Sequence, residues 1–216
     1  MYEKPRALKD HFGLDSEPEV MANYNITPDR MILTVIREQA EPAFVYLKWG
    51  LVPHWSAKSK PDYKMINARI EGVWDKPSFR SAIRYRRCLI PASGFYEWKK
   101  EDSGKTPYYI TIKEENIFAM AGIWEVWKDK SSQEIIESCT ILTTQAKGIV
   151  SDIHDRMPVI LDRYGYNLWL DPMVQTQNDL EIREVNPKLL SVYPVSTKVN
   201  SPANNSPELI EPYAKK

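Results

Sequence analysis

The chain has 216 residues, and its 29 Lys plus Arg balance its 29 Asp plus Glu, so the formal net charge is zero. Hydrophobic residues make up 43% and charged residues 27%, which are ordinary values for a soluble globular protein. No apolar run approaches the roughly 20 residues that span a bilayer, and the first ten residues, MYEKPRALKD, contain no apolar signal core. We therefore expect a cytoplasmic protein without a membrane segment.

The sequence predicts many short elements, because sixteen prolines and eight glycines interrupt it. Residues 4–14 are expected to form a short amphipathic helix that ends at Gly13. Further helices are expected at 76–87, 145–153 and 162–170, and strands at 31–38, 43–53, 88–100, 106–113, 116–128, 138–144, 157–161 and 189–196. Because the strands do not alternate strictly with helices, we expect an α+β fold. We expect a single domain over 1–216, ending in a polar C-terminal tail at 199–216.

Cys88 and Cys139 lie in apolar, β-branched runs without a neighbouring cysteine. This pattern favours buried strand cysteines in a reducing compartment over a zinc site. The histidines, His11, His54 and His154, are scattered and lack the close spacing of chelating pairs. We therefore expect no metal and no cofactor.

The zero net charge hides a segregation of charge along the chain. Residues 57–100 contain eleven Lys plus Arg and four Asp plus Glu, a balance of +7, whereas the remaining residues carry 18 basic and 25 acidic groups, a balance of −7. A basic stretch rich in Trp, Tyr and Phe fits a phosphate backbone and stackable bases. The alternative is an ordinary solvated basic face, and composition does not separate the two.

Polar groups occur in apolar surroundings in four short stretches, which are WGLVPHW at 49–55, INARIE at 66–71, GFYEW at 94–98 and DIHDRMP at 152–158. In a strand, Phe95, Glu97 and Lys99 would share one face. A carboxyl among aromatic side chains is desolvated, which raises its pKa and suits acid–base catalysis. The alternative is a structural ion pair between Glu97 and an Arg or Lys of the basic stretch.

His154 lies between Asp152 and Asp155, directly ahead of Arg156. The flanking carboxylates could orient the imidazole or stabilise its protonated form, which would suit proton transfer. A histidine that caps the preceding helix or fills a polar pocket is the alternative.

Asn67 and Arg69 are two residues apart, so they would share a face of an extended segment. There an Asn can hold a substrate oxygen and an Arg can hold a phosphate. A turn Asn and a surface Arg are the alternative.

Five segments taken in order carry a resemblance to a known family, and they are WGLVPHW, KMINARIE, SFRSAIRYRRCLIPASGFYEWKK, DIHDRMPVIL and NSPANNSPELIEP. In order and spacing they resemble the SRAP family, the SOS-response-associated peptidases now understood as abasic-site processing proteins. Each motif is weak alone, but the set covers nearly the whole chain. The resemblance implies a mainly antiparallel, barrel-like sheet with flanking helices. It also implies a protein, expected to be a monomer, that binds single-stranded DNA and crosslinks covalently to abasic sites.

The resemblance implies a role for each matched residue. Glu97 corresponds to the general acid–base carboxylate. His154 corresponds to the residue that contacts the sugar-phosphate and helps to open the abasic sugar, and Asn67 to one that supports the active centre. The implied DNA contacts are the phosphate-binding Arg69, the base-stacking or wedging residues Trp49, Trp55 and Pro28, and the basic residues Arg80 and Arg156.

The first residues depart from the family, which opens Met-Cys-Gly-Arg-Phe, whereas this chain opens MYEKPRALKDHFGL. In the family the cysteine attacks the abasic aldehyde through its α-amine, whose ordinary pKa is about 8, and its thiol then closes a thiazolidine ring. Tyr2 offers no thiol, so the chain as written is not expected to form this link. Three explanations stay open: a start placed late or trimmed, a natural variant that binds DNA without crosslinking, or a reversible imine on the α-amine of Met1.

Two other functions are possible. A thiol peptidase acting on other proteins would need a nucleophile, a base and an oxyanion site, and the sequence contains no Gly-x-Ser-x-Gly or other nucleophile motif. The resemblance supports only removal of the initiator methionine in cis. A non-covalent single-strand-binding module would bind with steep salt dependence and without preference for abasic strands.

Overall fold

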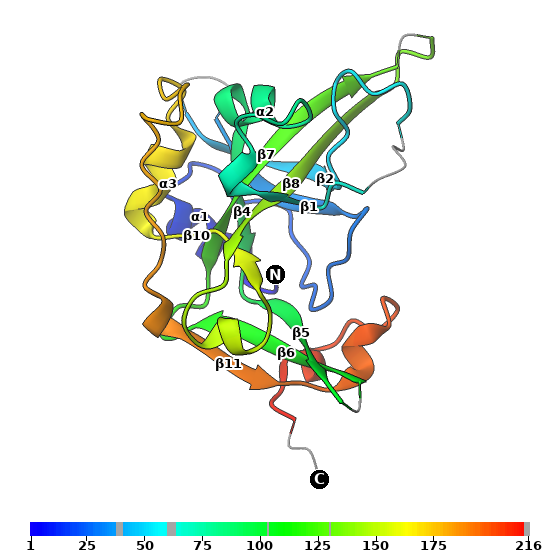
Figure 1. Ribbon diagram of the computed structural model, residues 1–216, viewed down its shortest axis with the longest axis vertical. Coiled ribbons are helices and arrows are strands. Elements are labelled where there is room, and N and C mark those ends of the chain that lie inside the picture. The colour runs from blue at the N-terminus through cyan, green and yellow to red at the C-terminus, as the bar shows by residue number, and fades with distance from the viewer. Residues whose placement is uncertain (38–40, 60–63, 103, 130, 214–216) are drawn as a thin grey trace.

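The computed structural model describes residues 1–37, 41–59, 64–102, 104–129 and 131–213 (Figure 1). Five strands close into a barrel, in the order β1 (Met31–Ile36), β2 (Ala43–Trp49), β8 (Ile135–Gln145), β7 (Phe118–Lys128) and β4 (Arg87–Ala92), with β4 pairing back to β1. Of these five pairings only β2–β8 is parallel. The predicted α+β fold around a mainly antiparallel, barrel-like sheet is therefore confirmed.

Further strands extend the barrel and form a second sheet. β10 (Ile160–Leu161) adds to β7, while β3 (Asn67–Arg69) and β9 (Arg156–Pro158) add to β8. A separate three-stranded sheet of β5 (Phe95–Glu101), β6 (Gly104–Ile112) and β11 (Leu190–Pro194) lies below the barrel in Figure 1.

The single strand predicted at 88–100 is wrong, because this run forms two strands in two different sheets. β4 ends at Ala92, and β5 begins after Ser93 and Gly94. A Cβ on Gly94 would come within 2.2 Å of the Tyr109 ring, so only glycine lets that ring pack against the connection. This break moves Glu97 out of the barrel and onto the second sheet.

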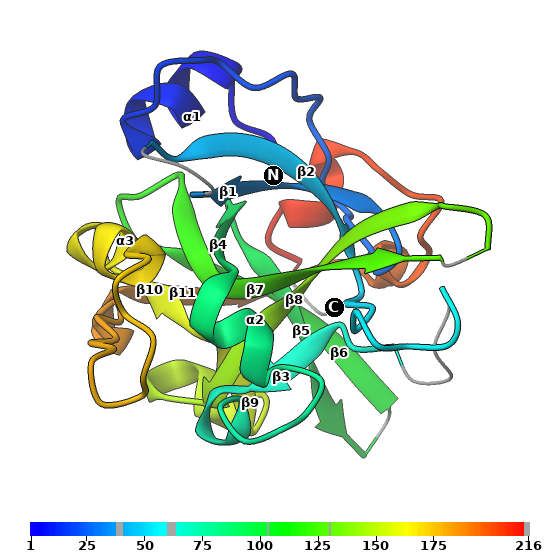
Figure 2. The same cartoon turned by 90° about the horizontal axis from the view of Figure 1, so that it is seen from above.

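In the part of the chain that the structure describes, three α-helices lie around the barrel: α1 (Pro5–Phe12), α2 (Arg80–Tyr85) and α3 (Arg163–Leu170) (Figure 2). α1 ends as predicted at Gly13, whose left-handed conformation (φ 64°) suits glycine. The helix predicted at 145–153 is wrong, because β8 continues to Gln145 and only the 3₁₀ turn η2 (Gly148–Asp152) follows. The other 3₁₀ turns are η1 (Ile70–Gly72), η3 (Pro187–Leu189), η4 (Thr197–Asn200) and η5 (Pro207–Ile210).

Apolar side chains fill the barrel and the space between the two sheets. Cys88 and Cys139 are both free and fully buried in barrel strands, as predicted. The segment predicted as a polar tail packs against the second sheet through the buried side chains of Val199 and Leu209, which contact the Tyr109 cluster.

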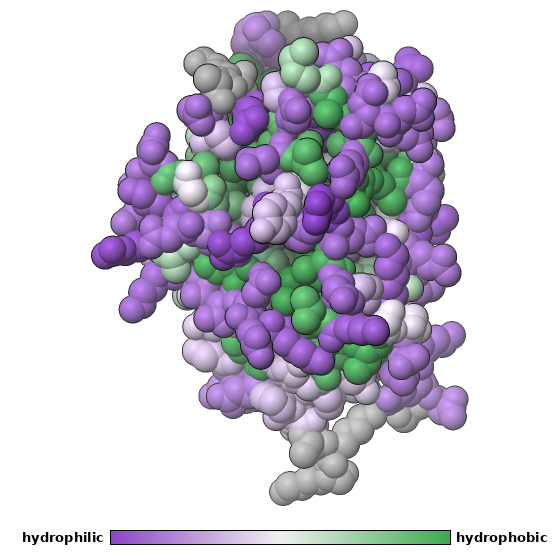
Figure 3. All heavy atoms as spheres, turned by 90° about the vertical axis from the view of Figure 1, so that its left-hand side faces the viewer, coloured by the Kyte–Doolittle hydropathy of each residue, from purple (hydrophilic) through white to green (hydrophobic). Residues whose placement is uncertain are grey.

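None of the helices in the described residues is both long enough and apolar enough to cross a membrane. On the face shown in Figure 3, hydrophilic side chains separate the apolar ones into small patches. Scattered apolar side chains of this kind are normal on a protein surface.

Candidate functional site

The end of strand β8 is the platform of the candidate site. β3 runs parallel to it, with Arg69 opposite Thr143, and β9 runs antiparallel, with Arg156 opposite Gln145. The NAR and HDRMP motifs, far apart in sequence, are thereby placed on either side of one strand end.

Glu97 and His154 are brought together at this platform from the two sheets. Glu97 lies on β5, and His154 lies between η2 and β9. His154 Nδ1 is 3.9 Å from Glu97 Oε2 and 3.3 Å from Asp155 Oδ1. Among the described residues the ion-pair partner of Glu97 is this histidine, and not an Arg or Lys of the basic stretch. The predicted alternative, an ion pair between Glu97 and an Arg or Lys of the basic stretch, is therefore not formed among the described residues.

The surroundings of Glu97 favour its protonated form. Burial raises the pKa of the Glu97 carboxyl above its ordinary value, His154 and a hydrogen bond from the Trp98 backbone lower it in part, and Asp155 raises it again. The net direction is upward, as the sequence predicted, and burial is its largest cause. A carboxyl of this kind can both donate and accept a proton closer to neutral pH.

The imidazole of His154 is held by the backbone of the residue that follows Asp155. Nδ1 lies 3.1 Å from the Arg156 amide nitrogen and 3.0 Å from the Arg156 carbonyl oxygen. A neutral ring protonated on Nε2 accepts from the amide, and a ring protonated on Nδ1 donates to the carbonyl. Within the described residues, the hydrogen bonds and ion pairs given for the His154 side chain all involve Nδ1.

Asn67 and Arg69 share an exposed face of β3, while Ala68 between them is buried. The prediction that they point the same way is therefore confirmed. Trp49 lies next to this segment, because its indole N–H donates to the carbonyl oxygen of Ile66, the residue before Asn67, at 2.9 Å. Pro28 lies beside the same tryptophan, since Asp29 N donates to Trp49 O at 2.8 Å and Trp49 N to Arg30 O at 2.9 Å.

Two of the predicted DNA contacts lie elsewhere on the molecule. Trp55 is 56% exposed, and its indole nitrogen is 3.4 Å from the Pro77 carbonyl oxygen. This contact places Trp55 near the start of α2, where the exposed Arg80 is the first helical residue. Trp49, in contrast, is half-buried, so the two tryptophans offer very different amounts of surface for stacking.

Arg156 is engaged within the protein. Its Nη1 donates to Glu71 Oε1 at 2.8 Å and its Nη2 to Glu71 Oε2 at 2.9 Å, while Nη2 also donates to the Thr143 carbonyl oxygen. This bidentate pair lowers the pKa of Glu71, chiefly through the hydrogen bonds. Glu71 and Thr143 were missed as site residues, because partners 85 and 13 positions from Arg156 leave no periodic signal.

Comparison with known proteins places the chain in a family. The sequence profile described as "SOS response associated peptidase (SRAP)" matches residues 1–202. The chain belongs to the SRAP family. It is 42% identical over 208 residues to "Abasic site processing protein YoqW" of Bacillus subtilis strain 168, covering 94% of this chain and 92% of that protein.

The chain also matches a more distant relative in sequence and a solved structure in fold. The chain is 33% identical over 195 residues to "Abasic site processing protein HMCES" of Xenopus tropicalis, covering 79% of this chain and 58% of that protein. A crystal structure of a protein from Bacteroides thetaiotaomicron is 26% identical and has a TM-score of 0.85, over 99% of this chain and 98% of that one.

The N-terminal residues of this SRAP chain lie beside the start of β5. The Met1 amine donates to the Asn23 carbonyl oxygen at 2.8 Å, and Ser93 Oγ donates to Met1 Sδ at 3.4 Å. Burial lowers the pKa of the Met1 amine to about 6, with Glu3 acting in the opposite direction. The Tyr2 ring stacks on Tyr24 at 5.1 Å between centroids. This end of the chain is therefore packed next to the strand that carries Glu97.

The cysteines of this SRAP chain are unsuited to nucleophilic attack. Burial raises the pKa of the Cys139 thiol to about 12 and that of Cys88 well above its ordinary value. A fully buried thiol with a raised pKa forms little thiolate and is not accessible to a substrate. In the described part of the chain, no three His, Cys, Asp or Glu residues gather as metal ligands would.

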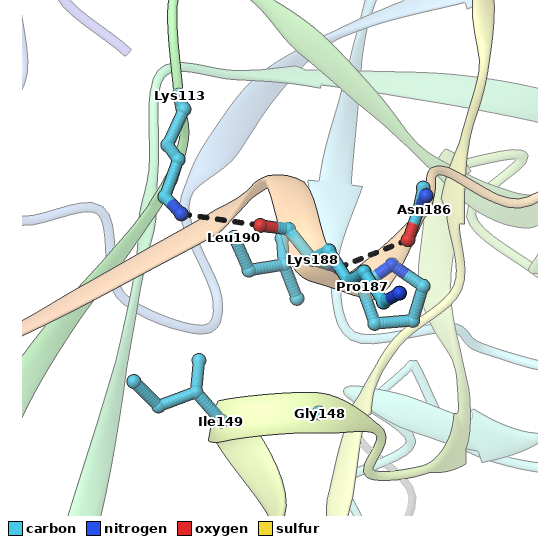
Figure 4. A pocket seen from close by; sticks show the side chains of 7 residues that line it. All are labelled: Lys113, Gly148, Ile149, Asn186, Pro187, Lys188 and Leu190. Atoms are coloured by element: carbon cyan, nitrogen blue, oxygen red, sulfur yellow. Dashed lines mark hydrogen bonds between the residues drawn. The ribbon is translucent and has the colours of Figure 1, made fainter.

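One hollow of this SRAP chain lies between η2 and η3, and its lining does not include Glu97 (Figure 4). It encloses about 420 Å³ and is lined by Lys113, Gly148, Ile149, Asn186, Pro187, Lys188 and Leu190. Lys113 Nζ reaches across one side of it to the Lys188 carbonyl oxygen at 3.2 Å. The side chains of Glu97 and His154 are 22% and 43% exposed, so this pair is accessible from the surface.

Proposed function

We propose that this chain processes abasic sites in single-stranded DNA. The observation that carries the proposal is the Glu97–His154 pair, a desolvated carboxyl 3.9 Å from an imidazole, beside the exposed Asn67–Arg69 face. The printed names of the YoqW and HMCES relatives support the same activity.

Glu97 and His154 would share the proton transfers that open the abasic sugar. Opening its cyclic hemiacetal removes one proton from the C1′ hydroxyl and delivers one to the ring oxygen, which exposes an aldehyde. The raised pKa of Glu97 suits an acid that can return as a base. Asn67 would hold a sugar or phosphate oxygen at this centre.

The DNA strand would be held by groups on both sides of the centre. Arg69 is exposed and free to approach a phosphate. Pro28 and Trp49 would lie against bases next to the lesion. Trp55 and Arg80, at the start of α2, would extend the contact along the strand, since stacking and phosphate contacts together suit single strands.

Covalent capture would need an N-terminal cysteine. Its α-amine would add to the aldehyde and release water as an imine forms, and its thiol sulfur would then add to the imine carbon to close a thiazolidine. Because both internal cysteines are buried, we expect this chain to bind and open abasic sites without forming that product. A chain beginning Met-Cys-Gly-Arg-Phe ahead of Tyr2 would form it after removing its own methionine.

A denaturing gel with a labelled single strand carrying one abasic site tests the proposal. The chain is compared with the version carrying the Met-Cys-Gly-Arg-Phe opening, and we expect a shifted band that survives heat and detergent only for the latter. If neither version shifts the strand, and binding shows no preference for abasic over intact strands, a non-covalent single-strand binder replaces the proposal. A shift by the unaltered chain would point to the Met1 amine.

A further inference from the structure

We propose that Glu71 is a positioning residue for His154 and acts through Arg156. The inference deepens the proposed function, because it concerns how the imidazole of that site is fixed. Glu71 lies in η1, immediately after the NAR strand. Its carboxylate binds the Arg156 side chain, and the Arg156 backbone in turn contacts His154.

The first step is the fixation of the Arg156 side chain. Two parallel hydrogen bonds to the Glu71 carboxylate, at 2.8 and 2.9 Å, define the plane of the guanidinium, and Thr143 accepts a third from Nη2. The remaining nitrogen, Nε, is buried and has no hydrogen-bond partner among the described residues, so the two Nη atoms alone set its orientation. The side chain is only 20% exposed, although its partner Glu71 is 53% exposed.

The second step is the transfer of that fixation to the imidazole. Both backbone groups of Arg156 lie within 3.1 Å of His154 Nδ1. The backbone of Arg156 is itself at the first position of β9, opposite Gln145. A side chain anchored to η1 therefore keeps Arg156, the first residue of a three-residue strand, from fraying. The backbone of Arg156 contacts the imidazole of His154.

The third step is the consequence for the site. With Nδ1 engaged by the backbone, the ring presents Nε2 as its free nitrogen. Without this anchor the ring could leave the backbone of Arg156, and the neutral imidazole would then exchange between its Nδ1-protonated and Nε2-protonated tautomers. Lysine could not replace Arg156, because a single ammonium lacks the planar fork that binds a carboxylate at two points.

Nitrogen-15 NMR of the free protein, labelled in histidine, tests this inference without DNA. In the unaltered chain at a pH where the ring is neutral, we expect His154 to show one protonated and one unprotonated ring nitrogen. In Glu71→Gln and in Arg156→Lys, we expect both resonances to move toward a common averaged position. Because the two residues act as one unit, the double variant should show no larger change than either alone.

Glu184→Gln is the matched control, since its carboxylate pairs with Lys147 at 2.7 Å on the other side of η2 and does not touch Arg156. The control should leave the His154 ring nitrogens unchanged. Unchanged resonances in Glu71→Gln, in a protein that melts at the same temperature as the unaltered chain, would overturn the inference.

Binding to an abasic single strand separates this inference from the proposed function. If Arg156 served instead mainly as a phosphate contact masked by Glu71, then Glu71→Gln would tighten binding and leave the ring nitrogens in place. Arg156→Gln would then reduce the slope of log K against log salt by about 0.7, as Arg69→Gln is expected to do. A failure of the proposed function would give a different result. The unaltered chain would then bind abasic and intact strands equally, while Glu71→Gln would still shift the nitrogen-15 resonances of the His154 ring.

Discussion

Glu125 and Glu97 are both largely buried carboxylates that face a histidine, but only Glu125 also binds an arginine. Glu125 lies on β7 with 4% of its side chain exposed, and its carboxylate is 3.0 Å from His54 Nδ1 and 2.8 Å from Arg86 Nη2. The Val126 amide donates to the same group at 3.0 Å. Glu97 is 22% exposed and faces His154 at the longer distance of 3.9 Å.

The difference between the two pairs lies in how the negative charge is compensated. At Glu125 a guanidinium and a backbone amide contact the carboxylate. The group thereby links three parts of the fold, which are the loop before α2 through His54, the end of α2 through Arg86, and the barrel strand β7. At Glu97 burial raises the pKa and so favours the neutral form, and the histidine opposes it more than the Trp98 backbone hydrogen bond does. A carboxyl is available for proton transfer where its charge is not already matched by an arginine, and this criterion separates the candidate catalytic pair from the structural one.

The largest effect that would separate the two pairs is on the rate of crosslinking. In the chain carrying the Met-Cys-Gly-Arg-Phe opening, Glu97→Gln should slow crosslinking to an abasic strand by roughly 10²- to 10⁴-fold, because an acid–base group is lost. The measurement is the rate of appearance of the shifted band at saturating protein. Glu101→Gln is the control, as it changes a carboxylate on the same face of β5 that accepts from Thr106 at 2.8 Å. Equal rates for the two variants would remove Glu97 from the chemistry.

The next effect is on stability and should fall on the other pair. Glu125→Gln leaves Arg86, whose side chain is 25% exposed, without its carboxylate, so we expect a loss of roughly 3 kcal/mol in the free energy of unfolding. Urea denaturation measures it, with Glu97→Gln as the comparison that should lose nothing at neutral pH. A loss below about 1 kcal/mol would mean that solvent compensates Arg86, and the contrast between the pairs would fail.

Features that depend on neighbours in sequence were predictable. The sequence predicted a raised pKa for Glu97 and a shared face for Asn67 and Arg69, and the structure confirms both. The helix ending at Gly13 and the burial of the two cysteines follow from equally local signals. In each case the cause is a property of the residue or of its period in the chain.

Features that depend on long-range contacts were not predictable from the residues. The strand-like pattern of residues 88–100 gives no sign that the chain changes sheet at Ser93 and Gly94. That change depends on the Tyr109 ring, which packs against Gly94 from a distant part of the sequence. In the sequence, nothing distinguishes Glu71 from an ordinary exposed acidic residue of the basic stretch. It meets Arg156 because β3 and β9 both pair with β8. The meeting of Glu97 and His154 was expected only from the family resemblance.

The smallest effect is a pH dependence of stability that belongs to Glu97. Its folded-state pKa is raised, so in the window between the ordinary Glu value of about 4.3 and the folded value the folded chain binds more protons than the unfolded chain. The free energy of unfolding must then fall as pH rises through that window, and the loss is complete above the folded pKa. Glu97→Gln cannot titrate, so its stability relative to the unaltered chain should increase over the same window and then level off.

Repeating the measurement in a His154→Gln background sharpens this prediction. The histidine is the strongest group that lowers the pKa of Glu97, so its removal should raise that pKa further. The window should then extend to higher pH, and Glu97→Gln should gain more stability than it does beside an intact His154. Urea denaturation between about pH 4 and pH 8 measures both differences. An equal gain in the free energy of unfolding in the two backgrounds would show that the histidine, 3.9 Å away, does not interact electrostatically with Glu97. The proposal that the two residues act together would then fail.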